Sequence, residues 1–430
     1  MRLLNLIRFN NKRRIYLLLD LAGSFDILLG MFLVLRYRDI LDLALSVILI
    51  LVGCTLIYPS IRHFINISKS HLKGSSSKIS NNQTNENDFI SKKMLAKGPK
   101  IVVIGGGTGL STMLRGLKVF SSNLTAIVTV ADDGGGSGVL RQDLGMLPPG
   151  DIRNCILALA DTEPVMEKLL QYRFKDGMLK GQSFGNLFLA AMDGISDSFE
   201  EAVKKMSDVL AVTGRVLPVT LQDVKLCAEL EDGYLVKGES RIGKHNSFHR
   251  GKIKSVYLEP ILIKPLQEAI DSILEADMIV LGPGSLYTSI IPNLLVPGIG
   301  DAIRKSNAIK AYVCNVMTQP GETEDYSVSD HVKAIEKHSY KGIIEYCIVN
   351  SAEIPDSLKK KYYEDGATTV KVDAEALERQ GIKVIDDDFV CINNNYIRHD
   401  TKRLSKIIIN LCENNCTNEE KKDSFTITSA

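Results

Sequence analysis

The sequence lacks a large net charge of either sign. Its 430 residues include 52 Lys and Arg against 51 Asp and Glu, which leaves a formal charge of +1 at pH 7. Proteins that bind nucleic acid through a basic surface carry an excess of Lys and Arg. The balance therefore argues against a nucleic-acid partner, and an anionic ligand has to be held by the local geometry of a site.

Dense cysteine spacing is also missing. The eight cysteines are scattered along the chain, unlike the disulfide framework of a small secreted protein. The one close pair, Cys412 and Cys416, has no second Cys or His pair at zinc-ligand spacing. We therefore expect reduced thiols in a cytoplasmic protein.

No signature of nucleophilic catalysis is present. The seven histidines are scattered, and no Gly-x-Ser-x-Gly motif marks a nucleophile elbow. The sequence also shows no internal repeat. We therefore predict no catalytic residue and turn to the segments that could bind a ligand.

Two long apolar stretches lie near the N-terminus. Residues 15–35 are mostly apolar, and residues 41–59 are nearly uncharged and about long enough to cross a bilayer at ~1.5 Å per residue. Basic residues precede the first stretch and follow the second, so both ends are predicted to face the cytoplasm. We predict a transmembrane helical hairpin over residues 1–67. A buried helical hairpin is the alternative, because Asp20 and Asp26 are costly in lipid.

A polar segment separates these stretches from the rest of the chain. Residues 68–97 are rich in Ser, Asn and Lys and poor in large apolar side chains, as in a flexible linker. Residues 414–430 form a similarly polar tail. The main domain is therefore predicted over residues 98–413, as a cytoplasmic domain tethered to the cell membrane.

Within the main domain, short β-branched runs alternate with longer helical patterns. The runs lie at residues 100–104, 125–130, 278–281, 311–316 and 345–349. This alternation predicts an α/β fold, a Rossmann-like, doubly wound and mostly parallel sheet with helices on both faces. The segment at about 215–258 instead alternates apolar and polar residues around an Asp-Gly turn, which predicts a small antiparallel β insertion.

The first candidate binding loop follows the first of these runs. It contains Gly105, Gly106, Gly107, Thr108 and Gly109, immediately before a helical pattern. Glycines let the backbone approach a ligand, and the N–H groups at a helix start favour an anion such as a diphosphate. Leu110 stands where the dinucleotide fingerprint has its third glycine, so a nicotinamide or flavin ligand is disfavoured. A tight turn without a ligand is the alternative.

The second candidate loop carries two acids. Asp132 and Asp133 follow the run at 125–130, at the end of a strand where ligands bind in open α/β sheets. One carboxylate would accept hydrogen bonds from ribose or sugar hydroxyls, and Asp133 would help to hold a divalent ion such as Mg²⁺ against phosphates. An Asp-Gly turn or a helix cap is the alternative.

Two later turns each open a helical pattern. Asp151 is placed to cap a helix, and Arg153 is the nearby cation. Asn186 follows Gly185 and offers the donor and the acceptor that recognition of a base or sugar requires. Capping alone would also explain Asp151 and Asn186.

A second strand–glycine–helix unit lies in the second half of the chain. The run at 278–281 leads into Gly282, Pro283, Gly284 and Ser285 and then into a helical pattern. Such a unit can cradle phosphate, and Ser285 can cap the helix or donate a hydrogen bond. Asn293 is a candidate polar contact at the same rim, or a turn former.

Together these motifs resemble the YvcK-like gluconeogenesis factors, relatives of the CofD 2-phospho-L-lactate transferases. The resemblance runs from about residue 100 to residue 411. It rests on GGGTG, ADDGG with the following SG and LR, LPPGDIRNC, GNL, GRVLP, GPGSLYTSIIPNLL and NVMTQPGET. The match is closer to the YvcK branch than to the transferases.

The resemblance implies a cleft for UDP-sugars such as UDP-N-acetylglucosamine, with no required cofactor. It also implies a role in cell shape and cell-wall homeostasis during growth on gluconeogenic carbon. Asn293 and Arg398 would belong to the nucleotide-sugar site, with Arg398 as a bidentate ligand of the diphosphate. The chain departs from the family's second loop at Gly136 and Val139, where Ser and Arg are expected.

Two functions follow from the resemblance. A regulator would sense a nucleotide-sugar and control a partner protein in envelope synthesis at the membrane, as a monomer or a homo-oligomer. An enzyme would use Mg²⁺ to transfer a phospho-acyl group from a nucleotide-diphosphate donor to an alcohol. We expect the regulator, although the fold alone does not separate the two.

Overall fold

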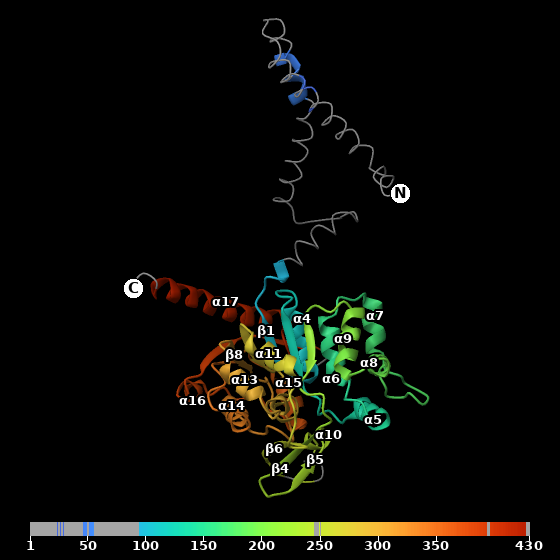
Figure 1. Cartoon of the computed structure of the whole chain (residues 1–430). Coiled ribbons are helices and arrows are strands. Elements are labelled where there is room, and N and C mark those ends of the chain that lie inside the picture. The colour runs from blue at the N-terminus through green and yellow to red at the C-terminus, as the bar shows by residue number, and fades with distance from the viewer. Residues whose placement is uncertain are drawn as a thin grey trace. The chain divides into compact units, whose positions relative to one another are not determined.

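The protein is described by a computed structural model. The described residues are 24, 26, 29, 46–49, 51–55, 94–244, 249, 251–393 and 396–426. The chain divides into two compact units, Met1–Thr84 and Asn85–Ala430, and the division falls inside the predicted linker. Every strand of the described chain belongs to the second unit (Figure 1).

A seven-stranded parallel sheet forms the centre of the second unit. Its strands are β1 (Ile101–Gly105), β2 (Leu124–Val128), β3 (Arg215–Pro218), β7 (Met278–Leu281), β8 (Ile309–Val313), β9 (Tyr346–Asn350) and β10 (Lys383–Asp387). Their order is β10-β9-β8-β7-β1-β2-β3, with every neighbouring pair parallel. The chain winds outward from β1 in one direction and from β7 in the other, so the order reverses between these two central strands.

Helices cover both faces of this sheet. Right-handed crossovers place the helices between β1, β2 and β3 on one face and those between β7, β8, β9 and β10 on the other. α4 (Gly107–Leu117) packs against α6 (Gly150–Leu159) and α17 (Thr401–Thr426), whereas α11 (Gln267–Leu274) packs against α13 (Ile299–Lys305). The mostly parallel α/β sheet is therefore confirmed.

The remaining helices are shorter or lie at the margins of the sheet. They are α5 (Gly135–Leu144), α7 (Pro164–Gln171), α8 (Phe184–Gly194), α9 (Phe199–Val209), α10 (Glu239–Ile242), the π-helical turn η3 (Leu286–Ile290), α12 (Ile291–Leu294), α14 (Val328–Lys337), α15 (Asp356–Glu364) and α16 (Ala374–Glu378). The core lies between these layers, because the strands β1, β2 and β7 are buried along their whole length.

The antiparallel insertion begins later than predicted. β4 (Lys225–Leu230), β5 (Leu235–Lys237) and β6 (Ile253–Glu259) form a sheet of order β5-β4-β6. Residues 215–218, assigned to the insertion from the sequence, form β3 and pair in parallel with β2. A four-residue strand is too short for its sequence to show which sheet it joins, and that explains the error. A further antiparallel pair, β11 (Val390–Asn393) and β12 (Tyr396–His399), was not predicted.

The predicted membrane hairpin lies mostly outside the described residues. In the described part of the chain, no single helix has the length and hydropathy of a membrane span, and the apolar helix Ser46–Thr55 is too short. Two helical segments joined by a bend, Leu286–Leu294 and Ile299–Lys305, together reach the length and the hydropathy of a membrane span. Their Ile290 and Ile299 are fully buried, as in core helices of a globular domain. The described residues therefore lend the hairpin no support.

The C-terminal helix is longer than the sequence suggested. α17 continues to Thr426, through the boundary placed at residue 413. The predicted tail is polar, but Glu and Lys are good helix formers and do not end a helix by themselves.

Gly116 brings α17 close to α4. A Cβ added at Gly116 would clash with Oγ of Ser405 and lie 2.6 Å from the carbonyl oxygen of Thr401. We expect Gly116→Ala to lower the free energy of unfolding by roughly 1–3 kcal/mol through overpacking, as measured by chemical denaturation. Gly194→Ala is the control, because nothing lies within 4 Å of a Cβ there. An equal loss in both variants would contradict this account of the packing.

Candidate functional site

The two glycine loops meet where the sheet order reverses. We call Gly105–Gly109 the β1 loop and Gly282–Ser285 the β7 loop, because each follows the strand of that name. β1 and β7 are neighbours in the sheet, so both loops leave the same edge side by side. In open α/β sheets, ligands bind in the crevice at such a switch point.

The backbones of these loops touch. A Cβ added at Gly109 would lie 2.6 Å from the carbonyl oxygen of Pro283, and one at Gly284 would lie 3.3 Å from that of Gly106. Gly107 and Gly282 have φ angles of 70° and 79°, in the left-handed region that other residues rarely adopt. The glycines are therefore required by the packing of the loops as well as by any ligand.

A cavity of about 470 Å³ is lined by both loops. Among the predicted site residues, those that line it are Gly106, Gly107, Thr108, Gly109, Gly284, Ser285 and Arg398. The other parts of its wall are Thr112, Pro283, Ser289, residues 315–320, Tyr362, Asp365, Ala367, Ile397 and His399. Of these, Thr112, Tyr362, Asp365, Ala367 and Ile397 lie outside the motifs that the sequence offered. The structure thus brings the β1 loop, the β7 loop and Arg398 to one cavity.

Arg398 supplies the cation of this cavity. It lies on β12, its side chain is exposed, and its guanidinium carbon is 5.7 Å from the centre of the Tyr396 ring. The first N–H groups of α4 have no partner within the helix, and the residues that carry them, Gly107, Thr108 and Gly109, line the same cavity. Donors of this kind favour an anion such as phosphate.

A buried carboxylate lies behind the β1 loop. A Cβ added at Gly106 would lie 2.8 Å from Oδ2 of Asp151, and the backbone N–H of Gly107 donates to this carboxylate. Burial raises the pKa of Asp151 to about 7; Asp132 adds to the rise, while the Gly107 N–H and Arg153 oppose it. Asp151 was expected to cap its own helix, but it binds the start of α4 instead.

Glu322 binds the start of η3 as Asp151 binds the start of α4. Its Oε2 accepts a hydrogen bond from the backbone N–H of Tyr287 at 3.0 Å, and its Oε1 accepts one from Oγ1 of Thr288 at 3.0 Å. Burial raises its pKa to about 7. Sequence reasoning missed this residue, because a Glu that follows Pro-Gly resembles an exposed turn.

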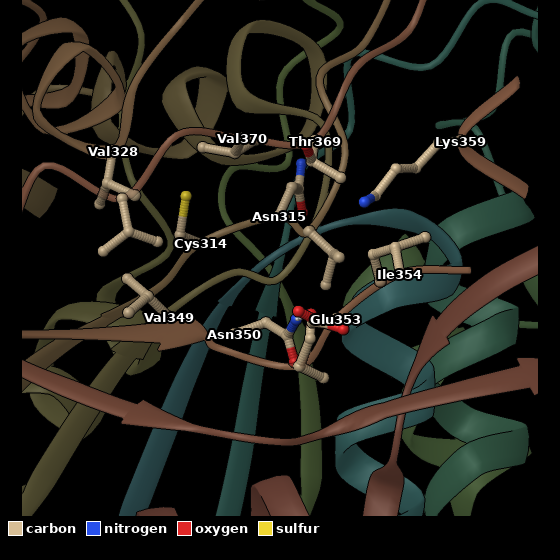
Figure 2. A pocket seen from close by; sticks show the side chains of 13 residues that line it. Cys314, Asn315, Val328, Val349, Asn350, Glu353, Ile354, Lys359, Thr369 and Val370 are labelled. Atoms are coloured by element: carbon tan, nitrogen blue, oxygen red, sulfur yellow. Dashed lines mark hydrogen bonds between the residues drawn. The ribbon is translucent and has the colours of Figure 1, made fainter. Parts of the chain in front are cut away.

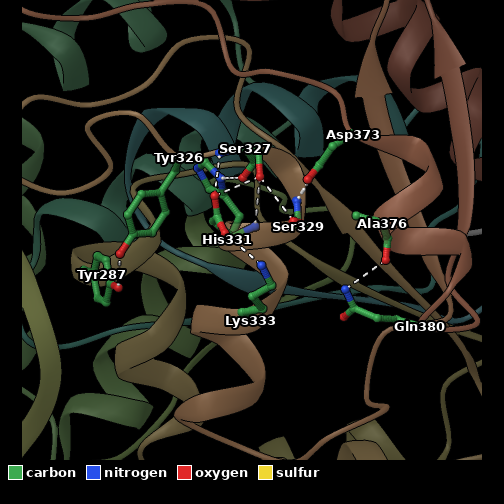
Figure 3. A network of polar contacts seen from close by, with 10 residues as sticks. Tyr287, Tyr326, Ser327, Ser329, His331, Lys333, Asp373, Ala376 and Gln380 are labelled. Carbon is green, nitrogen blue, oxygen red and sulfur yellow. Dashed lines mark hydrogen bonds and ion pairs between the residues drawn. The ribbon is translucent and has the colours of Figure 1, made fainter.

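Polar contacts hold the segment that follows Glu322. The hydroxyls of Tyr287 and Tyr326 are 2.8 Å apart (Figure 3). Ser327 and Asp330 form a capping box at the start of α14. The backbone N–H of Ser329 donates to Oδ1 of Asp373 at 3.0 Å (Figure 3). These contacts join Tyr326 to η3 and Ser329 to Asp373, the N-cap residue of α16.

Asp132 and Asp133 lie outside the cavity. Oδ1 of Asp132 accepts a hydrogen bond from the Gly134 N–H at 2.9 Å, and Oδ1 of Asp133 accepts one from the Ser240 N–H at 2.8 Å. The second bond ties the loop after β2 to the insertion. No three side chains in the described ranges are arranged to hold a metal ion. The sugar-binding and Mg²⁺-binding roles of these acids stay predictions.

The two predicted asparagines position other groups. Oδ1 of Asn186 accepts a hydrogen bond from Nε of Arg153 at 3.1 Å. Nδ2 of Asn293 donates to the carbonyl oxygens of Gly105 at 3.1 Å and Ser289 at 2.8 Å, and its side chain is fully buried. Neither asparagine lines the cavity, and Gly105 and Gly282 also lie behind its wall.

A smaller cavity of about 190 Å³ adjoins the first. Asn315 and Val316 line both cavities. Figure 2 shows Cys314 and Val349 on one side of the smaller cavity and Lys359 on the other. It extends the site along the carboxyl ends of β8 and β9.

The fold and the site define a doubly wound α/β protein with a cleft between paired glycine loops. The chain belongs to the family whose model is described as 2-phospho-L-lactate transferase CofD, which matches residues 101–390. It is 52% identical over 318 residues to the gluconeogenesis factor of Bacillus subtilis, covering 74% of this chain and 99% of that protein. A relative from Thermoanaerobacterium thermosulfurigenes is 64% identical over 316 residues, covering 74% and 98%. The expected YvcK-like relationship is therefore confirmed.

A solved structure and a longer relative extend the comparison. A crystal structure of a Bacillus halodurans protein described as a member of the UPF0052 family is 50% identical, with a TM-score of 0.69 over 72% of this chain and 98% of that one. A Clostridium acetobutylicum relative is 53% identical over 380 residues, covering 87% of this chain and 83% of its own. This match reaches further along the chain than the shorter relatives do.

Because burial raises the pKa of Asp151 and Glu322, we predict that the free energy of unfolding falls as the pH rises. Asp151 binds a proton more tightly in the folded chain, so its contribution is full below about pH 4 and is lost as the pH rises through about 7. We expect Asp151→Asn to recover about 1–4 kcal/mol of the free energy of unfolding that the wild type loses between pH 5 and pH 8. Chemical denaturation at both pH values measures it. The exposed Asp143→Asn is the control; a variant at Asp151 that keeps the wild-type pH dependence would contradict the prediction.

Proposed function

We propose that this chain is a gluconeogenesis factor that binds a nucleotide-sugar and regulates a partner protein. The observation that carries the proposal is the convergence of Arg398, the β1 loop and the β7 loop on one cavity. The diphosphate would lie across the start of α4, where Thr108 and the first N–H groups of the helix meet the guanidinium.

The buried carboxylates limit where the diphosphate can lie. Asp151 already accepts the Gly107 N–H, and Glu322 already accepts the Tyr287 N–H. The phosphates are therefore held by the remaining donors and by Arg398. An anion near Asp151 favours the protonated form of that acid, so binding takes up a proton and weakens as the pH rises through about 7.

The rest of the ligand would extend along β8 and β9. The smaller cavity offers Asn315 and Asn350 as amide partners and Val349 and Ile354 as apolar walls. His399 lines the larger cavity with a neutral ring, because burial lowers its pKa to about 4, and its buried Nε2 has no partner among the described residues. Groups of these kinds suit the uncharged ends of a UDP-sugar such as UDP-N-acetylglucosamine.

The regulator would act at the cytoplasmic face of the membrane. The two apolar stretches at 15–35 and 41–59 support attachment to the membrane, and the linker at 68–97 would leave the domain free to reach a partner in envelope synthesis. Attachment raises the local concentration of the domain for such a partner. Control of cell shape and cell-wall synthesis would follow from that contact.

The family model supports a second candidate function. Its description names a 2-phospho-L-lactate transferase, which suggests Mg²⁺-dependent transfer of a phospho-acyl group. Incubation with a nucleotide-activated phospholactate, an alcohol acceptor and Mg²⁺ separates the two functions. Product that forms with the wild type and not with Asp133→Asn would favour the transferase over the regulator.

Direct binding of UDP-N-acetylglucosamine tests the proposed site. We expect Arg398→Met to weaken affinity at least tenfold in isothermal titration calorimetry, because a charged hydrogen bond to the diphosphate is worth about 1.5–3 kcal/mol. Arg379→Met, on an exposed arginine at the end of α16, is the matched control and is expected to bind as the wild type does.

Asn293→Ala tests whether Asn293 supports the β1 loop or contacts the ligand. It removes the Nδ2 donor from the carbonyl oxygens of Gly105 and Ser289, while the Thr129 N–H still donates to that of Gly105, so we expect the free energy of unfolding to fall by about 1–3 kcal/mol. The proposed site is refuted if both Arg398→Met and Asn293→Ala bind UDP-N-acetylglucosamine with unchanged affinity.

A further inference from the structure

Arg153 is a buried cation that forms no direct ion pair with an acid of the described chain. Its side chain lies on α6 in a residue only 8% exposed, and its Nε donates to Oδ1 of Asn186. In the described part of the chain, its two Nη groups make no hydrogen bond or ion pair. A buried charge is costly unless a counter-charge accompanies it, so this arginine needs an explanation.

The groups around Arg153 add positive potential. Burial lowers the pKa of its guanidinium, and the neighbouring Arg173 lowers it further. Arg173 has an exposed side chain and donates to the carbonyl oxygen of Gly181. A Cβ added at Gly185 would lie 2.9 Å from Cδ of Arg153, which places the arginine against the first turn of α8. A helix carries its positive partial charge at that end.

Asp151 does not neutralise this region. It precedes Arg153 by two residues on α6 and opposes the fall in the pKa of the guanidinium, but the two side chains form no ion pair. Its carboxylate lies behind the β1 loop, where it accepts the Gly107 N–H. The acid therefore serves the start of α4 and compensates the charge of Arg153 only in part.

A second buried polar group at the start of α8 also lacks a partner. Gln182 is 8% exposed, and its Oε1 makes no hydrogen bond. It directly precedes Ser183, the N-cap residue of α8. A Cβ added at Gly136 would lie 2.8 Å from this Oε1, so the glycine at 136 leaves room for Gln182.

We propose that Arg153, Arg173 and the first turn of α8 form a second anion site, which takes a phosphate group. A guanidinium binds phosphate through two parallel hydrogen bonds, and the Nη groups of Arg153 are available for them. Asn186 is a positioning residue, because it holds Nε and fixes the plane of the guanidinium. None of these residues lines either cavity of the proposed nucleotide-sugar site, so the second site is separate from it.

Thermal unfolding of the full-length chain with inorganic phosphate tests this site. Sodium chloride at the same ionic strength provides the reference. We expect phosphate at about ten times its Kd to raise Tm by on the order of 2 °C in the wild type. The rise is expected to disappear in Arg153→Met and to persist in part in Arg153→Lys. Without phosphate, Arg153→Met is expected to unfold at no lower temperature than the wild type, since it removes a buried charge that is compensated only in part.

Three further variants separate this site from the nucleotide-sugar site and from a general effect on folding. Arg398→Met is expected to keep the phosphate response, whereas Arg173→Met and Asn186→Ala are expected to reduce it. The proposal is overturned if the wild type shows no response, or if the response survives Arg153→Met and is lost in Arg398→Met. If Arg153→Met does not fold, an unchanged response in Arg173→Met overturns it.

A final comparison identifies the source of the phosphate. Glycerol phosphate replaces inorganic phosphate in the same measurement on the wild type. A larger shift with the ester indicates the phosphate group of an organic metabolite, and an equal or smaller shift indicates free phosphate.

Discussion

The site depends on the contact between two backbones at the centre of the sheet. Gly109 meets Pro283 at a distance that leaves no room for a Cβ atom, and a Cβ at Gly284 would be tight against Gly106. This contact is possible because β1 and β7 are parallel neighbours that end at the same edge. It sets the width of the cleft, the direction in which α4 and η3 begin, and the place that Arg398 on β12 can reach.

Negative charge inside the protein shapes what the cleft can bind. Asp151 and Glu322 each accept a backbone N–H at the start of one of the two helices. Both carboxylates are buried, and burial raises the pKa of each to about 7. A helix start that already holds an internal carboxylate has fewer donors left for an external anion. The cleft therefore depends on Arg398 more than the glycine loops alone suggest.

Much of the fold could be predicted from the sequence. The β-branched runs identified five of the parallel strands, and the Asp-Gly turn correctly marked the hairpin of β4 and β5. Local patterns could not show that Arg215–Pro218 joins the main sheet, because a short apolar strand suits either sheet. The pairing of β11 with β12, which positions Arg398, was also missed, because two strands of four residues each are too short to show a clear alternation.

The candidate site was predictable in its loops but not in its supporting contacts. Glycines at strand ends are visible in a sequence because their spacing is local. The direction of Asn293, away from the cavity and toward the carbonyl oxygen of Gly105, depends on a residue 188 positions away in the chain. Asp151 likewise serves α4 rather than its own helix, and Glu322 serves η3 across a loop. Such contacts arise from tertiary packing, which residue spacing does not encode.

The most direct test of the central claim is a crystal structure of the chain with UDP-N-acetylglucosamine. The account predicts that the diphosphate lies in the cleft between the β1 loop and the β7 loop, within hydrogen-bonding distance of the Arg398 guanidinium and the Thr108 N–H. A ligand bound beside Asp132 and Asp133, with Arg398 out of reach of its phosphates, would contradict it.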